Sequence, residues 1–167
     1  VDVGTNGELA LRRGSDLMVC STAAGPALEG AALSCGMRAA NGAIEHVRIT
    51  ETAVACDVIG DVPPVGICGS GIIDIVAELL DRGLLDSYGR LLEREEVKGG
   101  IPEYLLDHII QMDGQPAFLL ARAVDPGGSA RDVVITQRDI RQIQLAKGAI
   151  SAGISLILRE MGVALDD

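Results

Sequence analysis

The stretch Gly66–Asp74 (GICGSGIID) decides the fold class of this chain of 167 residues. The apolar run 65–68 is typical of a short buried strand, and it leads directly into Gly69-Ser70-Gly71. A helix is predicted next, with Gly83 as its natural end. Its apolar residues recur at helical spacing, namely Ile72, Ile73, Val76, Leu79 and Leu80. A strand that passes straight into a helix is a unit of α/β proteins.

The segments before this unit are mostly strand-like. Residues 1–3, 9–12 and 17–20 are short apolar runs, and Asn6-Gly7 between the first two is a strong hairpin signal. Pro26 suits the first turn of a helix that ends near Gly36 and carries Leu28, Ala31, Ala32 and Cys35 on one side. Residues 42–59 are β-like again.

The segments after it combine turns, strands and one long helix. We expect a short helix over 103–111 and strands over 117–123 and 132–135, with a turn at 125–128. Thr136 and Asp139 form a capping-box pattern that opens the longest helix. Its apolar stripe consists of Ile140, Ile143, Ile150, Ile154, Ile157 and Met161, and its small residues Gly148, Ala149, Ala152 and Gly153 predict close packing. The whole order predicts one α/β domain over residues 1–167.

Composition excludes several classes of function. The chain carries 14 Lys and Arg against 24 Asp and Glu, a net charge of −10, which argues against nucleic acid as a partner. The longest uncharged runs have 12 residues, whereas a membrane helix needs roughly 18, so we expect no membrane partner and a soluble, cytoplasmic protein. Four widely spaced cysteines without a CxxC pair favour free buried thiols, with a metal site or disulfides as alternatives.

The first candidate site is Asp2–Glu8 (DVGTNGE), a strand end followed by a glycine-rich hairpin. Gly4 and Gly7 leave backbone N–H groups open to phosphate oxygens, and Thr5 and Asn6 add side-chain donors. Asp2 is the candidate ligand of Mg²⁺, which keeps several waters and needs few carboxylates. The alternative is an ordinary Asn-Gly hairpin.

Two further candidates lie at helix starts. Gly69, Ser70 and Gly71 form the turn between the strand at 65–68 and the helix that follows. Free N–H groups and the helix dipole at this helix start favour an anion. Alternatively, Ser70 only caps that helix. Glu29, within Cys20–Gly30 (CSTAAGPALEG), is placed to accept hydrogen bonds from ribose hydroxyls or simply to complement a helix dipole. His46 and His108 are interpreted as surface or packing residues.

Five segments together resemble one known family, the reductive activators of corrinoid-dependent enzymes, which are ATP-dependent iron–sulfur proteins. They occur in the family's order and leave mainly residues 84–130 unmatched. The segments are Asp2–Glu8, Cys20–Gly30, Gly36–Glu45 (GMRAANGAIE), Gly66–Asp74 and Thr136–Gly153 (TQRDIRQIQLAKGAISAG).

The resemblance implies the fold of the actin, sugar-kinase and heat-shock ATPases: lobes with a ribonuclease-H-like mixed sheet flanked by helices. This chain resembles the second lobe, excised from a longer polypeptide, with 84–130 as a variable insertion. Asp2 would match the acidic Mg²⁺/water position, residues 4–7 the phosphate turn and, more loosely, Glu29 a group near the nucleoside. The first phosphate loop, the adenosine loop and the cluster-binding cysteines of the iron–sulfur domain are not among these residues.

The implied function is to bind ATP and drive one-electron reduction of cob(II) to cob(I) in a corrinoid protein or corrinoid-dependent methyltransferase, with ATP and Mg²⁺ as cofactors. A homodimer is a further expectation of the resemblance. The alternatives are an activator of acyl-CoA dehydratases or a small-molecule kinase from the same superfamily, and a docking lobe that does not hydrolyse ATP.

Overall fold

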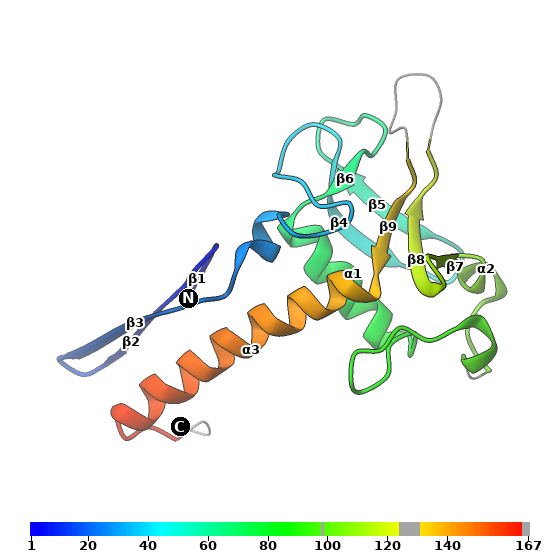
Figure 1. Ribbon diagram of the computed structural model, residues 1–167. Coiled ribbons are helices and arrows are strands. Elements are labelled where there is room, and N and C mark those ends of the chain that lie inside the picture. Colours follow the sequence, from blue (N-terminus) through cyan, green and yellow to red (C-terminus); the bar gives the residue numbers. More distant parts are fainter. Residues whose placement is uncertain (98, 124–130, 165–167) are drawn as a thin grey trace.

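The computed structural model describes residues 1–97, 99–123 and 131–164 (Figure 1). Within them, the strands form three sheets of three strands each, in the orders β1-β2-β3, β5-β4-β6 and β7-β8-β9. Three α-helices and two 3-10 helices connect and cover these sheets. The α/β class predicted from the sequence is confirmed, with its strands divided among small sheets.

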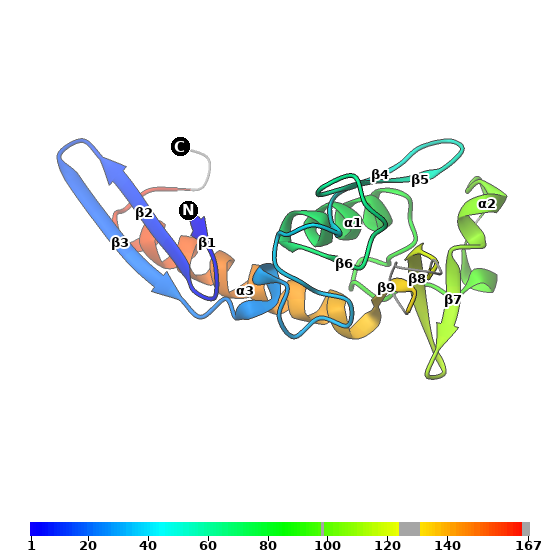
Figure 2. The same cartoon turned by 90° about the horizontal axis from the view of Figure 1, so that it is seen from above.

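The first sheet is an antiparallel meander of β1 (Asp2–Val3), β2 (Gly7–Arg13) and β3 (Asp16–Thr22). Helix α3 (Gln137–Glu160) packs along one of its faces (Figure 2). A Cβ on Gly153 would lie 2.3 Å from Thr22 Cγ2 and 2.5 Å from Leu9 Cδ1. The close packing predicted for the small residues of this helix is therefore confirmed at Gly153, whereas a Cβ on Gly148 would meet nothing within 4 Å.

The second sheet is mixed and supports helix α1 (Gly69–Asp81). Strand β4 (Ala43–Ile49) pairs antiparallel with β5 (Val54–Val58) and parallel with β6 (Gly66–Ile67). A Cβ on Gly71 would lie 2.4 Å from Ile44 O, so glycine lets the helix approach this strand. The core between them is formed by aliphatic side chains that include Ile44, Val47, Ile67, Ile72, Ile75 and Leu79.

The third sheet follows the short helix α2 (Glu103–Leu106). It pairs β7 (Ile109–Met112) with β8 (Gln115–Ala121) and β8 with β9 (Val133–Thr136), all antiparallel. Strand β9 leads into α3 through the predicted capping box. Asp139, which is buried, also accepts hydrogen bonds from Ser34 N at 2.8 Å and Ser34 Oγ at 3.1 Å, so it ties residues 33–36 to this corner.

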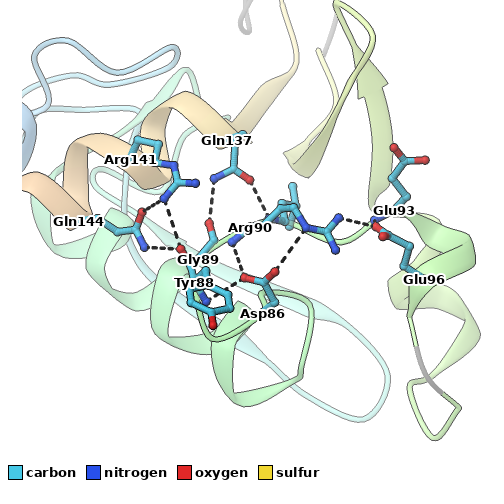
Figure 3. A network of polar contacts seen from close by, with 10 residues as sticks. Asp86, Tyr88, Gly89, Arg90, Glu93, Glu96, Gln137, Arg141 and Gln144 are labelled. Atoms are coloured by element: carbon cyan, nitrogen blue, oxygen red, sulfur yellow. Dashed lines mark hydrogen bonds and ion pairs between the residues drawn. The ribbon is translucent and has the colours of Figure 1, made fainter.

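The loop after α1 is fixed to the first turns of α3 (Figure 3). Gln137 accepts from Leu91 N at 2.7 Å and donates to Gly89 O at 2.8 Å, while Gln144 donates to Tyr88 O at 2.9 Å. Asp86 closes the turn by accepting from the backbone N–H groups of Tyr88 and Arg90. The loop is thus anchored both by these polar contacts and by the buried side chains of Leu84, Leu85 and Leu91. A 3-10 helix, η2 (Arg94–Glu96), follows it.

Several sequence-based predictions are wrong in detail. The helix expected from Pro26 to Gly36 is only a 3-10 helix, η1 (Pro26–Glu29), because Gly30 turns left-handed at φ 79° and lies against the backbone of Met37. The helix expected over 103–111 ends at Leu106, and β7 replaces its second half. The turn predicted at 125–128 lies outside the described residues.

Helix α1 also departs from its prediction in two respects. Of the predicted stripe, Ile73 and Leu80 are 51% and 53% exposed, and Ile75 takes their place in the core. Ser70 does not cap the helix: the N-cap residue is Cys68, without a side-chain capping bond. Gly83, at φ 68°, does end the helical segment as predicted, and its N–H bonds Leu80 O.

The cysteines are free thiols, but only Cys35 and Cys68 are buried, so the expectation of four buried thiols is half correct. Burial and the nearby Asp57 raise the pKa of Cys56 to about 11. In the residues that the structure describes, no helix combines the length and apolar character needed to cross a membrane.

Candidate functional site

A tight turn, Gly4–Asn6, joins β1 to β2 at one end of the first sheet. Gly4 N donates to Asn6 O at 2.9 Å, which closes the turn on itself. Gly25 N donates to Thr5 O at 2.8 Å and so ties the turn to the start of η1. Gly7 lies inside the sheet, where a Cβ would be 2.7 Å from Thr22 Oγ1; this glycine permits close packing.

Glu29, the last residue of η1, reaches back to this turn. Its Oε1 atom accepts from Thr5 N at 2.6 Å and from Thr5 Oγ1 at 2.7 Å. These hydrogen bonds, the one from the hydroxyl first, hold the pKa of Glu29 below its ordinary value, and the charge of Arg38 acts in the same direction. The first and third candidate sites of the sequence are therefore one site.

The start of α1 adjoins the same residues. A Cβ on Gly69 would lie 1.9 Å from Leu28 O, so only glycine lets α1 begin directly against η1. Beside this contact lies an open cavity of about 430 Å³, lined by Leu28, Glu29, Arg38, Ala39, Cys68, Gly69 and Ser70. The second candidate site thus joins the other two at this cavity, through Gly69 and the exposed Ser70. Gly71, in contrast, is buried against β4.

A second cavity, of about 530 Å³, shares Leu28 with the first in its lining. It is lined by Val3, Leu28, Ile73, Ile143, Lys147, Ile150, Ser151, Ile154 and Ser155. Sequence reasoning assigned the isoleucines of this set to core stripes and missed Lys147 and Ser151. The sequence did hold a signal for this cavity: Lys147 is the one cation between Ile143 and Ile150 of the predicted apolar stripe. The exposure of Ile73 is explained by its place in this cavity wall.

Asp2 lies two residues before the turn, on the face of the sheet opposite to α3. Its register partner is Glu8, and Glu8 Oε1 lies 3.5 Å from Ser21 Oγ. An open hollow of about 640 Å³ includes all three residues in its lining. In the described parts of the chain there is no group of three or more His, Cys, Asp or Glu side chains that could hold a metal. The pair of carboxylates nevertheless fits Mg²⁺, which usually takes one or two carboxylates and fills its remaining positions with water and phosphate.

The structure therefore brings the candidate residues together through Glu29, which contacts Gly4 and Thr5 and lines the 430 Å³ cavity with Gly69 and Ser70. Asn6 closes the turn and Asp2 precedes it, whereas Gly7 and Gly71 are packing positions. The chemistry available is that of anion binding: a backbone N–H and a hydroxyl aimed at one oxygen, the first turn of α1, and Arg38 at the cavity rim.

Comparison with known proteins gives a consistent result. Residues 1–167 match the family described as the C-terminal domain of RACo, the ASKHA domain. The corrinoid activation enzyme RamQ of Eubacterium limosum is 38% identical over 168 residues, which are 100% of this chain and 28% of that protein. The [Co(II) methylated amine-specific corrinoid protein] reductase of Methanosarcina barkeri is 28% identical over 188 residues, 99% of this chain and 29% of that protein.

A solved structure, the reductive activator for corrinoid, iron–sulfur protein, superimposes with a TM-score of 0.79 at 37% identity. The match covers 98% of this chain and 25% of that one. The chain thus spans little more than a quarter of the length of these relatives.

Proposed function

Since the chain belongs to the family of the C-terminal ASKHA domain of RACo, we propose that it supplies an MgATP-binding lobe to a protein that reduces cob(II) to cob(I) in a corrinoid protein or methyltransferase. Its relatives are named for corrinoid activation and for reduction of a corrinoid protein. The relatives are much longer than this chain, so the proposal assigns it nucleotide binding and leaves electron delivery to other parts of such a protein.

The observation that carries the proposal is the orientation of Thr5. Its N–H and its hydroxyl both point at one anionic oxygen, at 2.6 and 2.7 Å, from a turn that contains Gly4. Two convergent donors on a turn with little side-chain bulk are what a phosphate oxygen requires. An ordinary Asn-Gly hairpin has no need of this arrangement.

The two cavities that share Leu28 suit the two halves of a nucleotide. The 430 Å³ cavity carries Arg38 and the first turn of α1, which favour phosphate. The 530 Å³ cavity is lined mainly by aliphatic side chains, with Lys147 and Ser151 as polar groups, which favours a nucleobase. Ser70, which lines the first cavity, would then face the phosphates.

Asp2, with Glu8 opposite, is the proposed holder of Mg²⁺ and its waters. The ion would neutralise charge on the phosphates and orient them. The chain's own residues would position the nucleotide, so that hydrolysis would depend on positioning and electrostatics. ATP would favour the conformation that the corrinoid partner also favours, and this coupling is reciprocal.

The test is MgATP binding in the full-length natural polypeptide, followed by ligand-observed NMR. Thr5→Val removes one donor of the pair but keeps a β-branched side chain, and we expect it to weaken binding about tenfold, in line with the loss of a hydrogen bond to a charged group. Thr52→Val, in the turn between β4 and β5, is the matched control and should bind as the wild type does. Equal affinity of both variants would contradict the proposed phosphate turn.

Partner activity needs a separate assay. The absorbance change of a cob(II) corrinoid protein on reduction, with MgATP and with a non-hydrolysable analogue, would report ATP-dependent reduction. If reduction proceeds equally without nucleotide, the proposed role of ATP is wrong even if the lobe binds it.

A further inference from the structure

We infer that Glu29 is an internal competitor of the nucleotide: its carboxylate holds the Thr5 donors in the empty lobe and must leave them before a phosphate group can bind. This inference rests on the proposed function, since it assumes that the Gly4–Asn6 turn receives phosphate. It adds a self-inhibitory contact to that site.

The contact reproduces what a phosphate oxygen would do. One carboxylate oxygen takes both Thr5 donors, at 2.6 and 2.7 Å, and it also lies 3.0 Å from the position of a Cβ on Gly4. The oxygen therefore lies against the surface that glycine leaves open. A carboxylate and a phosphate oxygen cannot share these two donors, and their like charges oppose each other at that separation.

The surroundings of Glu29 allow its side chain to move. It is exposed, it ends a 3-10 helix of four residues, and the left-handed Gly30 follows it, so its side chain can rotate without disturbing the core. The structure also offers a second position for the carboxylate. Arg38 lines the same cavity and is close enough to lower the pKa of Glu29. A carboxylate that leaves Thr5 can pair with this guanidinium.

The consequence is a lower apparent affinity. If the Thr5 donors are free in only about one tenth of the molecules, the apparent Kd for a phosphate ligand rises about tenfold. Removal of the carboxylate should abolish that cost. Tighter ATP binding after removal of the Glu29 carboxylate would identify a competitor, because loss of a ribose ligand would weaken ATP binding.

The first measurement is amide hydrogen exchange at Thr5 without nucleotide. Glu29→Ala should accelerate it, and Glu29→Gln, which keeps a neutral acceptor, should have an intermediate effect. The second is the Kd for MgATP and for inorganic tripolyphosphate, which has no ribose, both in the full-length polypeptide. The control is Glu95→Ala, at an exposed position in η2, because it changes the net charge by the same amount as Glu29→Ala does. We expect Glu29→Ala to bind both ligands about tenfold more tightly than Glu95→Ala does.

Each other result overturns the inference. Unchanged exchange at Thr5 would mean that the contact does not form in solution. Faster exchange with no gain in tripolyphosphate affinity over Glu95→Ala would remove the competition, while ATP binding by the wild type would leave the proposed function intact. Weaker ATP binding with unchanged tripolyphosphate binding would make Glu29 a ribose ligand. If no variant binds either ligand, the proposed function fails and the competition fails with it.

Discussion

Asp2 and Glu8 face each other directly across the β1–β2 pair, two carboxylates on one face of the sheet. Like charges in directly opposed positions destabilise an antiparallel pair. A cation between or near them would turn this repulsion into attraction, in line with the proposed Mg²⁺ site beside the proposed phosphate turn.

Asp2→Asn should therefore separate stability from function. We expect an unchanged or slightly higher melting temperature without ligand, because the repulsion is relieved, and weaker Mg²⁺-dependent ATP binding. Thermal unfolding with and without MgATP would measure both effects. A variant that is stabilised by MgATP as strongly as the wild type would exclude Asp2 as the holder of the metal.

Two glycines in α3 should respond in opposite ways to alanine. Gly148→Ala places a methyl group in open space and should raise the free energy of unfolding by about 0.5–1 kcal/mol, because alanine favours the helix. Gly153→Ala drives a methyl group into Thr22 and Leu9 and should lower it by about 1–2 kcal/mol after that helix gain. Urea unfolding of the two variants provides the comparison, and effects of the same sign would contradict the packing of α3 on the first sheet.

Asp139 is a buried carboxylate that four hydrogen bonds satisfy, two from Ser34 and two from Thr136. Asp139→Ala should cost about 2–3 kcal/mol, because it removes half of the capping box and leaves partly buried N–H groups without a partner. Amide exchange should rise at Ser34 and Thr136 together. Faster exchange at Thr136 alone would mean that Asp139 caps the helix without holding the 33–36 segment.

His46 should titrate above an ordinary histidine. Its Nδ1 atom lies 3.0 Å from Asp74 Oδ2, and this hydrogen bond raises the pKa of His46. The protonated form is thus favoured in the folded state, so its stabilising effect is full below about pH 6.5 and is lost as the pH rises through the higher folded value. NMR titration of the two histidines would show it, and Asp74→Asn should bring the His46 value down. A His46 value unaffected by that substitution would contradict the pairing.

Local chemistry made much of this fold predictable. The Thr136–Asp139 capping box and Gly83 each specify a conformation through their own backbone or side-chain bonds. Asn6-Gly7 predicted the β1–β2 hairpin, but the turn itself is Gly4–Asn6 and Gly7 lies in β2. The strand β7 was missed, although Asp113-Gly114, with φ values of 53° and 76°, is a strong hairpin signal between Met112 and Gln115. Residues 103–111 fit both a helical and a strand pattern. The second half of this segment became a strand because β7 pairs with β8, a contact that the periodicity of the sequence does not reveal.

The candidate site was predictable only in pieces. Thr5, Glu29 and Gly69 were each identified from a local motif, but their meeting depends on long-range packing. The decisive contacts join Thr5 to Glu29, 24 residues away, and Gly69 to Leu28. The apolar cavity was hidden for the same reason: Ile73 and Ile143 read as core residues in their own helices, and only the arrangement of α1 beside α3 makes them cavity walls.

Helix α3 has 24 residues and is therefore about 36 Å long. One end is clamped through Asp139 to Ser34 beside the third sheet, and the other lies on the first sheet, with Gly153 against Thr22 and Leu9 (Figure 1). It can act as a lever: a tilt of about 5° at the clamped end would carry the far end by roughly 3 Å over that length. That is comparable to a hydrogen-bond length. A displacement of the third sheet would therefore be transmitted through α3 to the first sheet, which carries the proposed phosphate turn.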